Sequence, residues 1–160
     1  MLNLDQMITW RRHLHKYPEL SRQEFETSQY IYEQLSVLPN VRLSRPTETS
    51  VMAEIGQGPR TILFRADIDA IAGTEKNDVD YKSTREGVMH TCGHDTHTAM
   101  LMGVVTELAQ NAEKLHGTVR CVFQHSEEKK PSGAEELVQA GICEGVEWAF
   151  GLHIEPCLPT

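Results

Sequence analysis

The alternation of strand-like and helix-like segments in the second half of the chain is the feature that most restricts the fold. Apolar side chains recur at helical spacing from Leu101 to Ala112, and residues 118–124 form an apolar run typical of a buried strand. Residues 132–139 then predict a short helix, and residues 146–154, rich in aromatic and branched side chains, predict a last strand. This order predicts an α/β layer fold with partly parallel strands.

Two helices are expected at the start of the chain. Apolar positions follow helical spacing from Leu4 until Pro18, which cannot continue a helix. Ser21, with Glu24 three residues later, has the pattern of a capping box that begins a second helix, and Pro39 ends that helix.

Two strands are expected after these helices. Residues 51–55 alternate between apolar and polar positions, residues 56–59 supply a turn, and residues 61–64 form a short apolar run, which together predict a hairpin. Residues 73–89 are charged and predict an irregular segment. A length of 160 residues without an internal repeat fits one domain.

The charge balance excludes some classes of partner. There are 15 basic and 23 acidic side chains, and no run of Lys or Arg is longer than a pair, so we expect neither nucleic acid nor anionic lipid as a partner. The longest apolar stretch, 99–105, is too short to span a bilayer, and we expect no membrane association. No basic-then-apolar leader precedes the first predicted helix, so we expect a cytoplasmic protein.

The cysteines fit a reducing compartment. They form no C-x-x-C pair and no dense framework, so they are expected to be core thiols or metal ligands rather than disulfides: Cys92, Cys121, Cys143 and Cys157.

Residues 90–97 read H-T-C-G-H-D-T-H and concentrate potential metal ligands just before a predicted helix. Gly93 lacks a side chain, so the loop can bend and bring the Cys92 thiolate and the His94 imidazole to one cation, as borderline-soft metals prefer. The motif predicts a metal site. Two other interpretations stay open at this point: histidines that cap the helix or hydrogen-bond in the core, and a Cys–His pair that forms a thiol nucleophile with its base.

Two adjacent carboxylates, Glu127 and Glu128, follow the predicted strand 118–124, where an open α/β sheet faces its ligand crevice. One carboxylate can bind a cation while its neighbour takes a proton from water, which hydrolytic metal sites need. A second pair, Glu135 and Glu136, falls on a predicted helix and is expected to be a solvated face.

Two further strand ends carry polar groups. His153 lies at the end of the last predicted strand, where a lone histidine is usually structural. Asp67 and Asp69 alternate onto one face at the end of an earlier strand and could orient an imidazole or bind a metal, with an N-cap or a solvated turn as the alternative. We count Asp69 and Glu127 as the candidate catalytic residues.

In this order, R-A-D-I-D-A, H-T-C-G-H-D-T-H, F-Q-H-S-E-E and F-G-L-H resemble the amidohydrolase branch of the aminoacylase/carboxypeptidase G metallopeptidase family. This branch includes hippurate hydrolases, N-acetyl-diaminopimelate deacetylases and hydrolases of auxin–amino acid conjugates. The opening W-R-R-H-L-H-K-Y-P-E-L-S also resembles it. The resemblance implies a zinc-peptidase-like α/β fold, with a mixed β-sheet flanked by helices on both faces.

The resemblance also implies roles for single residues and a reaction. Four residues match metal ligands: Cys92, His94, Glu128 and His153. Glu127 matches the general base. The implied reaction is hydrolysis of the amide bond of a small N-acyl amino acid, such as hippurate or an N-acetyl amino acid. It uses two divalent transition-metal ions, and a cysteine ligand favours zinc or manganese, with cobalt or nickel as further candidates.

Members of this family are longer and bring a final ligand histidine from near their C-terminus. The resemblance therefore implies that residues 1–160 are the truncated N-terminal portion of the catalytic domain, without the lid and dimerisation domain. We expect this short chain to lack activity and to self-associate through uncovered surface. The alternatives are a metal-binding fragment or scaffold without turnover, and a hydrolase with Cys92 as its nucleophile.

Overall fold

The central sheet has the strand order β1-β2-β6-β3-β7 in the computed structural model, which describes residues 3–155. Its strands are β1 (Val41–Ser44), β2 (Val51–Gly56), β3 (Thr61–Asp67), β6 (Thr118–Gln124) and β7 (Val146–Gly151). β2 is antiparallel to β1 and β6, whereas β3 runs parallel to β6 and β7. The predicted α/β fold with a mixed sheet is therefore confirmed.

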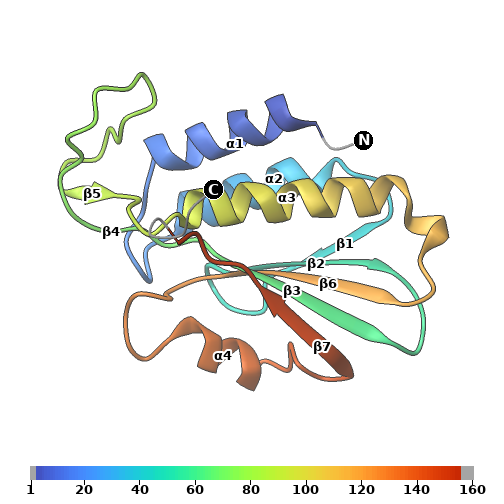
Figure 1. Cartoon of the computed structure of the whole chain (residues 1–160). Helices are drawn as coiled ribbons and strands as arrows, with labels where there is room; N and C mark the ends of the chain where they lie inside the picture. Colours follow the sequence, from blue (N-terminus) through green and yellow to red (C-terminus); the bar gives the residue numbers. More distant parts are fainter. Residues whose placement is uncertain (1–2, 156–160) are drawn as a thin grey trace.

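Helices cover both faces of this sheet (Figure 1). α1 (Leu4–Lys16), α2 (Phe25–Ser36) and α3 (His94–Gln110) lie over one face, and α4 (Gly133–Gln139) lies over the other. Ser132 caps α4 by accepting a hydrogen bond from the backbone N–H of Ala134, as expected for a helix that begins after a serine. None of the helices within residues 3–155 is long and apolar enough to cross a bilayer.

Two apolar cores fix β6 in the sheet. Cys121 and Phe123 pack into the larger core under α1, α2 and α3, whereas Val122 packs with Leu137 and Ile142 on the α4 side. Successive side chains of a strand point to opposite faces, so a strand that is apolar at every position suits a site covered on both sides. Thr118, Arg120 and Gln124 of β6 are polar, but its stretch from Cys121 to Phe123 is apolar and contributes to both cores. Because β3 runs parallel to β6 and β7, the carboxyl ends of these three strands lie at the same edge.

The predicted hairpin of residues 51–55 and 61–64 is wrong. Both strands exist, but β2 and β3 each pair with β6, which lies between them. The turn residues end β2 correctly. The turn residues do not determine which strand pairs with β2. Because β6 buries side chains on both faces, it is more stable in the middle of the sheet, between β2 and β3, than at an edge.

The predicted capping box of the second helix is also wrong. α2 begins at Phe25, and its first turn is capped by Glu19, whose carboxylate accepts a hydrogen bond from the backbone N–H of Thr27 at 2.7 Å. The Ser21 hydroxyl donates instead to Oδ2 of Asp69, at 2.6 Å. A carboxylate is a stronger acceptor than a neutral group, so this long-range bond replaces the local one.

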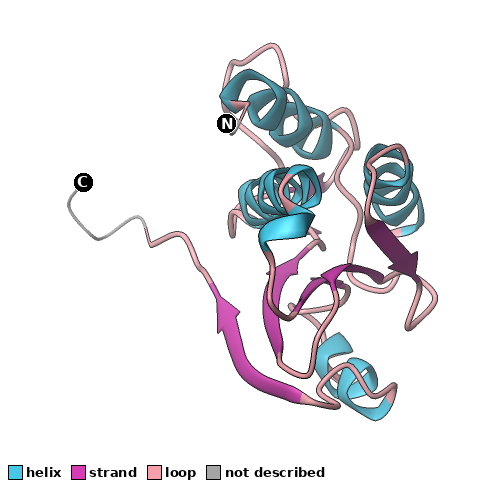
Figure 2. Ribbon diagram, turned by 90° about the vertical axis from the view of Figure 1, so that its right-hand side faces the viewer, coloured by secondary structure: helices cyan, strands magenta, loops and turns pink. Residues whose placement is uncertain are grey.

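Several boundaries differ from the sequence-based expectation. The last strand ends at Gly151, three residues early, and α3 ends at Gln110, followed by a short 3₁₀ helix η1 (Ala112–Lys114). The segment expected to be irregular is bounded by a two-stranded sheet of β4 (Ile71–Ala72) and β5 (Val88–Met89). β7 forms an outer edge of the large sheet (Figure 2). The predicted thiol Cys157 lies outside the described residues.

Candidate metal centre

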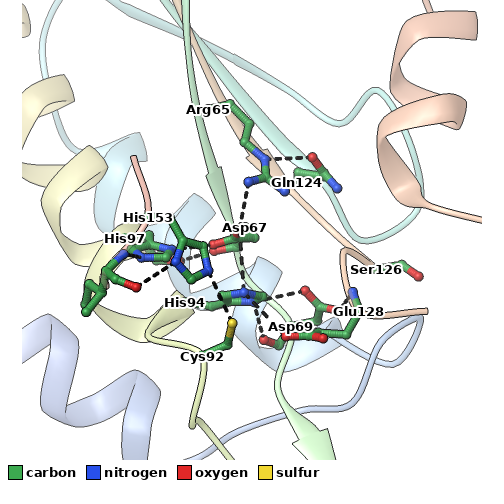
Figure 3. Close-up of polar contacts among 12 residues, drawn as sticks. Arg65, Asp67, Asp69, Cys92, His94, His97, Gln124, Ser126, Glu128 and His153 are labelled. Carbon is green, nitrogen blue, oxygen red and sulfur yellow. Dashed lines mark hydrogen bonds and ion pairs between the residues drawn. The ribbon is translucent and has the colours of Figure 1, made fainter. Parts of the chain in front are cut away.

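The candidate site lies where the parallel strands end and α3 begins (Figure 3). Asp67 ends β3, Glu127 and Glu128 follow β6, and His153 follows β7. His94 is the first residue of α3. Because the carboxyl ends of parallel strands share one edge, residues far apart in the sequence meet there.

Gly93 sets the direction of the chain into α3. Its φ of 85° is in the left-handed region, which a residue with a side chain rarely adopts. A Cβ at this position would lie 2.8 Å from Cδ1 of Ile154. The glycine therefore permits both the turn between Cys92 and His94 and the close approach of the segment that carries His153.

The structure brings the four residues predicted as metal ligands together. Cys92 Sγ lies 3.3 Å from His153 Nε2, and a ring nitrogen of His94 lies within 4.8 Å of both atoms. His94 Nε2 lies 3.7 Å from Glu128 Oε1, and one carboxylate oxygen of Glu127 joins His94 and Glu128 within the same 4.8 Å limit. One sulfur, two imidazoles and two carboxylates thus surround a small volume.

The hydrogen bonds of two histidines leave lone pairs directed into this volume. His94 Nδ1 lies 2.8 Å from the backbone carbonyl of Asp69, and His153 Nδ1 lies 2.7 Å from the carbonyl of Ile154. A carbonyl can only accept, so each Nδ1 carries the proton and each Nε2 holds a lone pair. His94 Nε2 is buried and has no hydrogen-bond partner among the described residues. These tautomers fit metal ligands whose second nitrogen is held by the protein.

His97 connects the sheet to the segment that carries His153. The backbone N–H of Ile154 donates to His97 Nε2 at 2.9 Å, so the ring proton is on Nδ1, which donates to Asp67 Oδ1 at 2.7 Å. Both ring nitrogens are therefore occupied, although His97 forms a close cluster with Asp67 and His94. The motif of residues 90–97 includes His97, but no role was predicted for this residue from the sequence. Asp67 orients the imidazole of His97, which is one of the two functions expected for Asp67 from the sequence.

Asp69 holds two other parts of the site. Its Oδ1 lies 3.3 Å from His94 Nδ1, and its Oδ2 accepts a hydrogen bond from the backbone N–H of Glu128 at 3.0 Å. Burial raises its pKa, but the bonds from His94, Ser21 and the neighbouring backbone N–H groups outweigh burial and lower the pKa to about 2. Asp69 therefore stays ionised at neutral pH and contacts His94 and Glu128 directly.

The site has an excess of negative charge. Four carboxylates surround His94, and Arg65 neutralises one of them through an ion pair with Asp67 at 2.7 Å. Burial lowers the pKa of His94, but the bond to Asp69 and the charges of Asp67 and Asp69 outweigh burial and raise it. The centre consequently attracts positive charge.

Cys92 is not an activated nucleophile in this environment. Burial, followed by the hydrogen bond and charge of Glu128, raises the pKa of the thiol to about 11. Nucleophilic cysteines have lowered pKa values and positively charged surroundings. The geometry therefore disfavours the thiol-hydrolase alternative and suits a thiol that loses its proton to a cation.

The second glutamate pair lies apart from this cluster, on α4. Glu135 is exposed, as expected for a solvated face, but Glu136 is partly covered and pairs with Arg22 at 2.7 Å and with His125 at 3.2 Å. The expectation of a fully solvated pair is wrong for Glu136, because Arg22 reaches it from the segment between α1 and α2.

The proteins with sequences similar to this chain include bacterial hydrolases. An N-acyl-L-amino acid amidohydrolase of Geobacillus stearothermophilus is 51% identical over 150 residues, which are 92% of this chain and 40% of that protein. An N-acetyl-L-cysteine deacetylase of Bacillus subtilis is 43% identical over 156 residues, 94% of this chain and 36% of that protein. The chain spans about two fifths of the length of these relatives.

The fold of this chain is also similar to a solved structure. A dinuclear metal binding peptidase from the M20 family of Bacillus subtilis superposes with a TM-score of 0.91 at 39% identity, over 97% of this chain and 44% of that one. Residues 63–160 match the sequence pattern of peptidase family M20/M25/M40, and this match contains every predicted ligand. The chain therefore belongs to peptidase family M20/M25/M40.

Proposed function

We propose that this chain contributes the metal-binding core of an enzyme that hydrolyses the amide bond of small N-acyl amino acids. The observation that carries the proposal is the convergence of Cys92 Sγ, His153 Nε2 and a ring nitrogen of His94, whose Nε2 has no hydrogen-bond partner among the described residues. The amidohydrolase and deacetylase relatives support the substrate class, because both act on N-acyl amino acids by name.

The donor set fits a transition metal. The residues that would hold it are Cys92, His94, Glu128 and His153, whose thiol, imidazole and carboxylate groups suit zinc or manganese first, and cobalt or nickel as alternatives. Two such ions, as in the dinuclear relative, would polarise the amide carbonyl and lower the pKa of water when bound. Asp69 would hold His94 and the Glu128 backbone in place.

Glu127 is the proposed general base. Its side chain is half-buried at the rim of the cluster, with an oxygen within 4.8 Å of a His94 nitrogen and of a Glu128 oxygen. From there the carboxylate takes a proton from the attacking water and passes it to the leaving amine. His94, Asp67 and Asp69 beneath the cluster are buried, and charges act more strongly in such surroundings than in water.

Residues 1–160 are proposed to be the N-terminal portion of the catalytic domain, with the lid and dimerisation domain and one ligand histidine supplied by other sequence. The 160 residues alone are then expected to bind metal without turnover and to self-associate. We further propose a cytoplasmic location and no nucleic-acid or membrane partner, consistent with the net charge of −8.

A chimera tests this function. The chain replaces the matching segment of the Geobacillus amidohydrolase, with which it shares 51% identity, and hippurate and N-acetyl amino acids are supplied with zinc or manganese. We expect hydrolysis by the chimera, and its loss with retained metal in the Glu127→Gln variant. A folded, metal-loaded chimera that leaves every N-acyl amino acid intact would contradict the proposal and favour the scaffold alternative.

A further inference from the structure

A fully buried carboxylate outside the metal cluster contacts the turn that carries the glutamate pair. Glu24 has 0% exposure, and its two carboxylate oxygens accept hydrogen bonds from the backbone N–H of Ser126 at 2.8 Å and from Thr49 Oγ1 at 3.0 Å. Although Glu24 is in the N-cap position of α2, its side chain caps no N–H of that helix. Burying a carboxylate is costly unless it is hydrogen-bonded, so these two contacts account for its position.

The contact with Ser126 fixes an unusual backbone conformation. Ser126 has a φ of 48°, in the left-handed region, and is also fully buried. This conformation is unfavourable for a residue with a side chain, so it persists only where surrounding contacts hold it. It turns the chain out of β6 immediately before Glu127 and Glu128.

A second carboxylate holds the other side of the same turn. The backbone N–H of Glu128 donates to Asp69 Oδ2, which also accepts from the Ser21 hydroxyl. Ser21 and Glu24 lie in one short segment between α1 and α2. This segment therefore supports the turn of residues 126–128 from both sides of Glu127.

We propose that Glu24 is a positioning residue of the metal centre. By accepting from the Ser126 N–H, it directs the Glu128 carboxylate toward His94, from which it lies 3.7 Å away. The bond is charge-assisted and buried, so it restrains the turn more than a neutral contact would. The inference rests on the proposed function in that it takes Glu128 to be a ligand.

The test measures zinc affinity by competition with a chromophoric chelator, together with the free energy of unfolding of the metal-free chain. Glu24→Met keeps the length of the side chain and removes both acceptor oxygens. We expect zinc affinity to fall about 10- to 100-fold, as for other groups that hold a ligand in place. Glu24→Gln keeps one acceptor oxygen and is expected to restore most of the affinity.

Glu19 provides a matched control. It is a second buried carboxylate of the same segment, but it bonds the Thr27 N–H and Arg85 rather than the 126–128 turn. Glu19→Met is expected to lower stability and leave zinc affinity unchanged. In a Glu128→Gln background, Glu24→Met should cause no further loss of affinity, because the two residues act through the same ligand.

The outcomes separate the inference from the proposed function. If the unaltered chain binds no zinc, the proposed function fails. If the unaltered chain binds zinc but Glu24→Met does not change zinc affinity, the positioning role is wrong. The positioning role is also wrong if Glu24→Met lowers zinc affinity equally with and without the Glu128 carboxylate. Should Glu24→Met not fold, Glu24→Asp withdraws the oxygens from Ser126 while keeping the charge. Glu24→Asp is expected to lower zinc affinity less than Glu24→Met does, and to have no effect in the Glu128→Gln background. An unchanged zinc affinity in Glu24→Asp would overturn the inference.

Discussion

Replacing His97 with phenylalanine should weaken metal binding without touching a predicted ligand. His97 is 4% exposed, so a ring of similar size can occupy its place. The substitution removes the acceptor for the Ile154 N–H and the donor to Asp67. The segment with His153 then loses the bond that ties it to the sheet.

The magnitude follows from these two bonds. The bond to the ionised Asp67 is expected to contribute about 1.5–3 kcal/mol and the bond from the Ile154 N–H about 1 kcal/mol, so the metal-free chain should lose about 2.5–4 kcal/mol of unfolding free energy. Zinc affinity should fall about 10- to 100-fold, because His153 is no longer held beside Cys92. That fall corresponds to about 1.4–2.8 kcal/mol.

Denaturant unfolding and competitive zinc titration measure the two effects separately. Thr98→Val is the matched control, because Thr98 is also buried and its hydroxyl donates to the backbone carbonyl of Asp67 rather than to the segment with His153. It should lower stability and leave affinity unchanged. If His97→Phe binds zinc as tightly as the unaltered chain, the proposed link from Asp67 through His97 to His153 is refuted.

Three further results are expected. Glu127→Gln should retain zinc in a titration of the 160-residue chain, whereas Glu128→Gln should weaken zinc binding; equal loss in both would show that the pair is misassigned. The hydrogen bond of His15 to Asp95 raises the pKa of His15, burial lowers it, and the hydrogen bond to Glu75 raises it further. The two hydrogen bonds outweigh burial, so the pKa of His15 lies above 6.5. The stability that His15 contributes is therefore complete below pH 6.5 and lost as pH rises through the raised folded-state pKa, so denaturant unfolding should show the advantage over His15→Gln shrinking as pH rises above 6.5. Sedimentation should detect self-association of the 160-residue chain through the exposed apolar side chains of β7, and a stable monomer at all concentrations would contradict this.

The sequence was sufficient to predict the strand ends that carry the site. Strand-like runs before Asp67 and Glu127 placed their carboxylates at one sheet edge, and the 90–97 motif placed Cys92 and His94 at the start of a helix. These predictions depend on local periodicity and on the rule that parallel strands share a carboxyl edge, so they hold without knowledge of the strand order.

Strand pairing and long-range hydrogen bonds could not be predicted in the same way. The 51–55 and 61–64 strands are adjacent in sequence, and only the double-sided burial of β6 separates them. Ser21 and Glu24 matched a local capping pattern, yet their partners lie 48 and 102 residues away. A local pattern cannot reveal that a distant carboxylate or a strained turn competes for the same side chain.

X-ray absorption at the zinc edge of the zinc-loaded chain tests the central claim most directly. We expect one sulfur scatterer at about 2.3 Å together with nitrogen and oxygen scatterers at about 2.0–2.2 Å. Cys92→Ser should remove the sulfur contribution, whereas Cys143→Ser, at an exposed thiol away from the cluster, should leave it unchanged. A spectrum without sulfur, or one that Cys92→Ser does not alter, would contradict the metal centre.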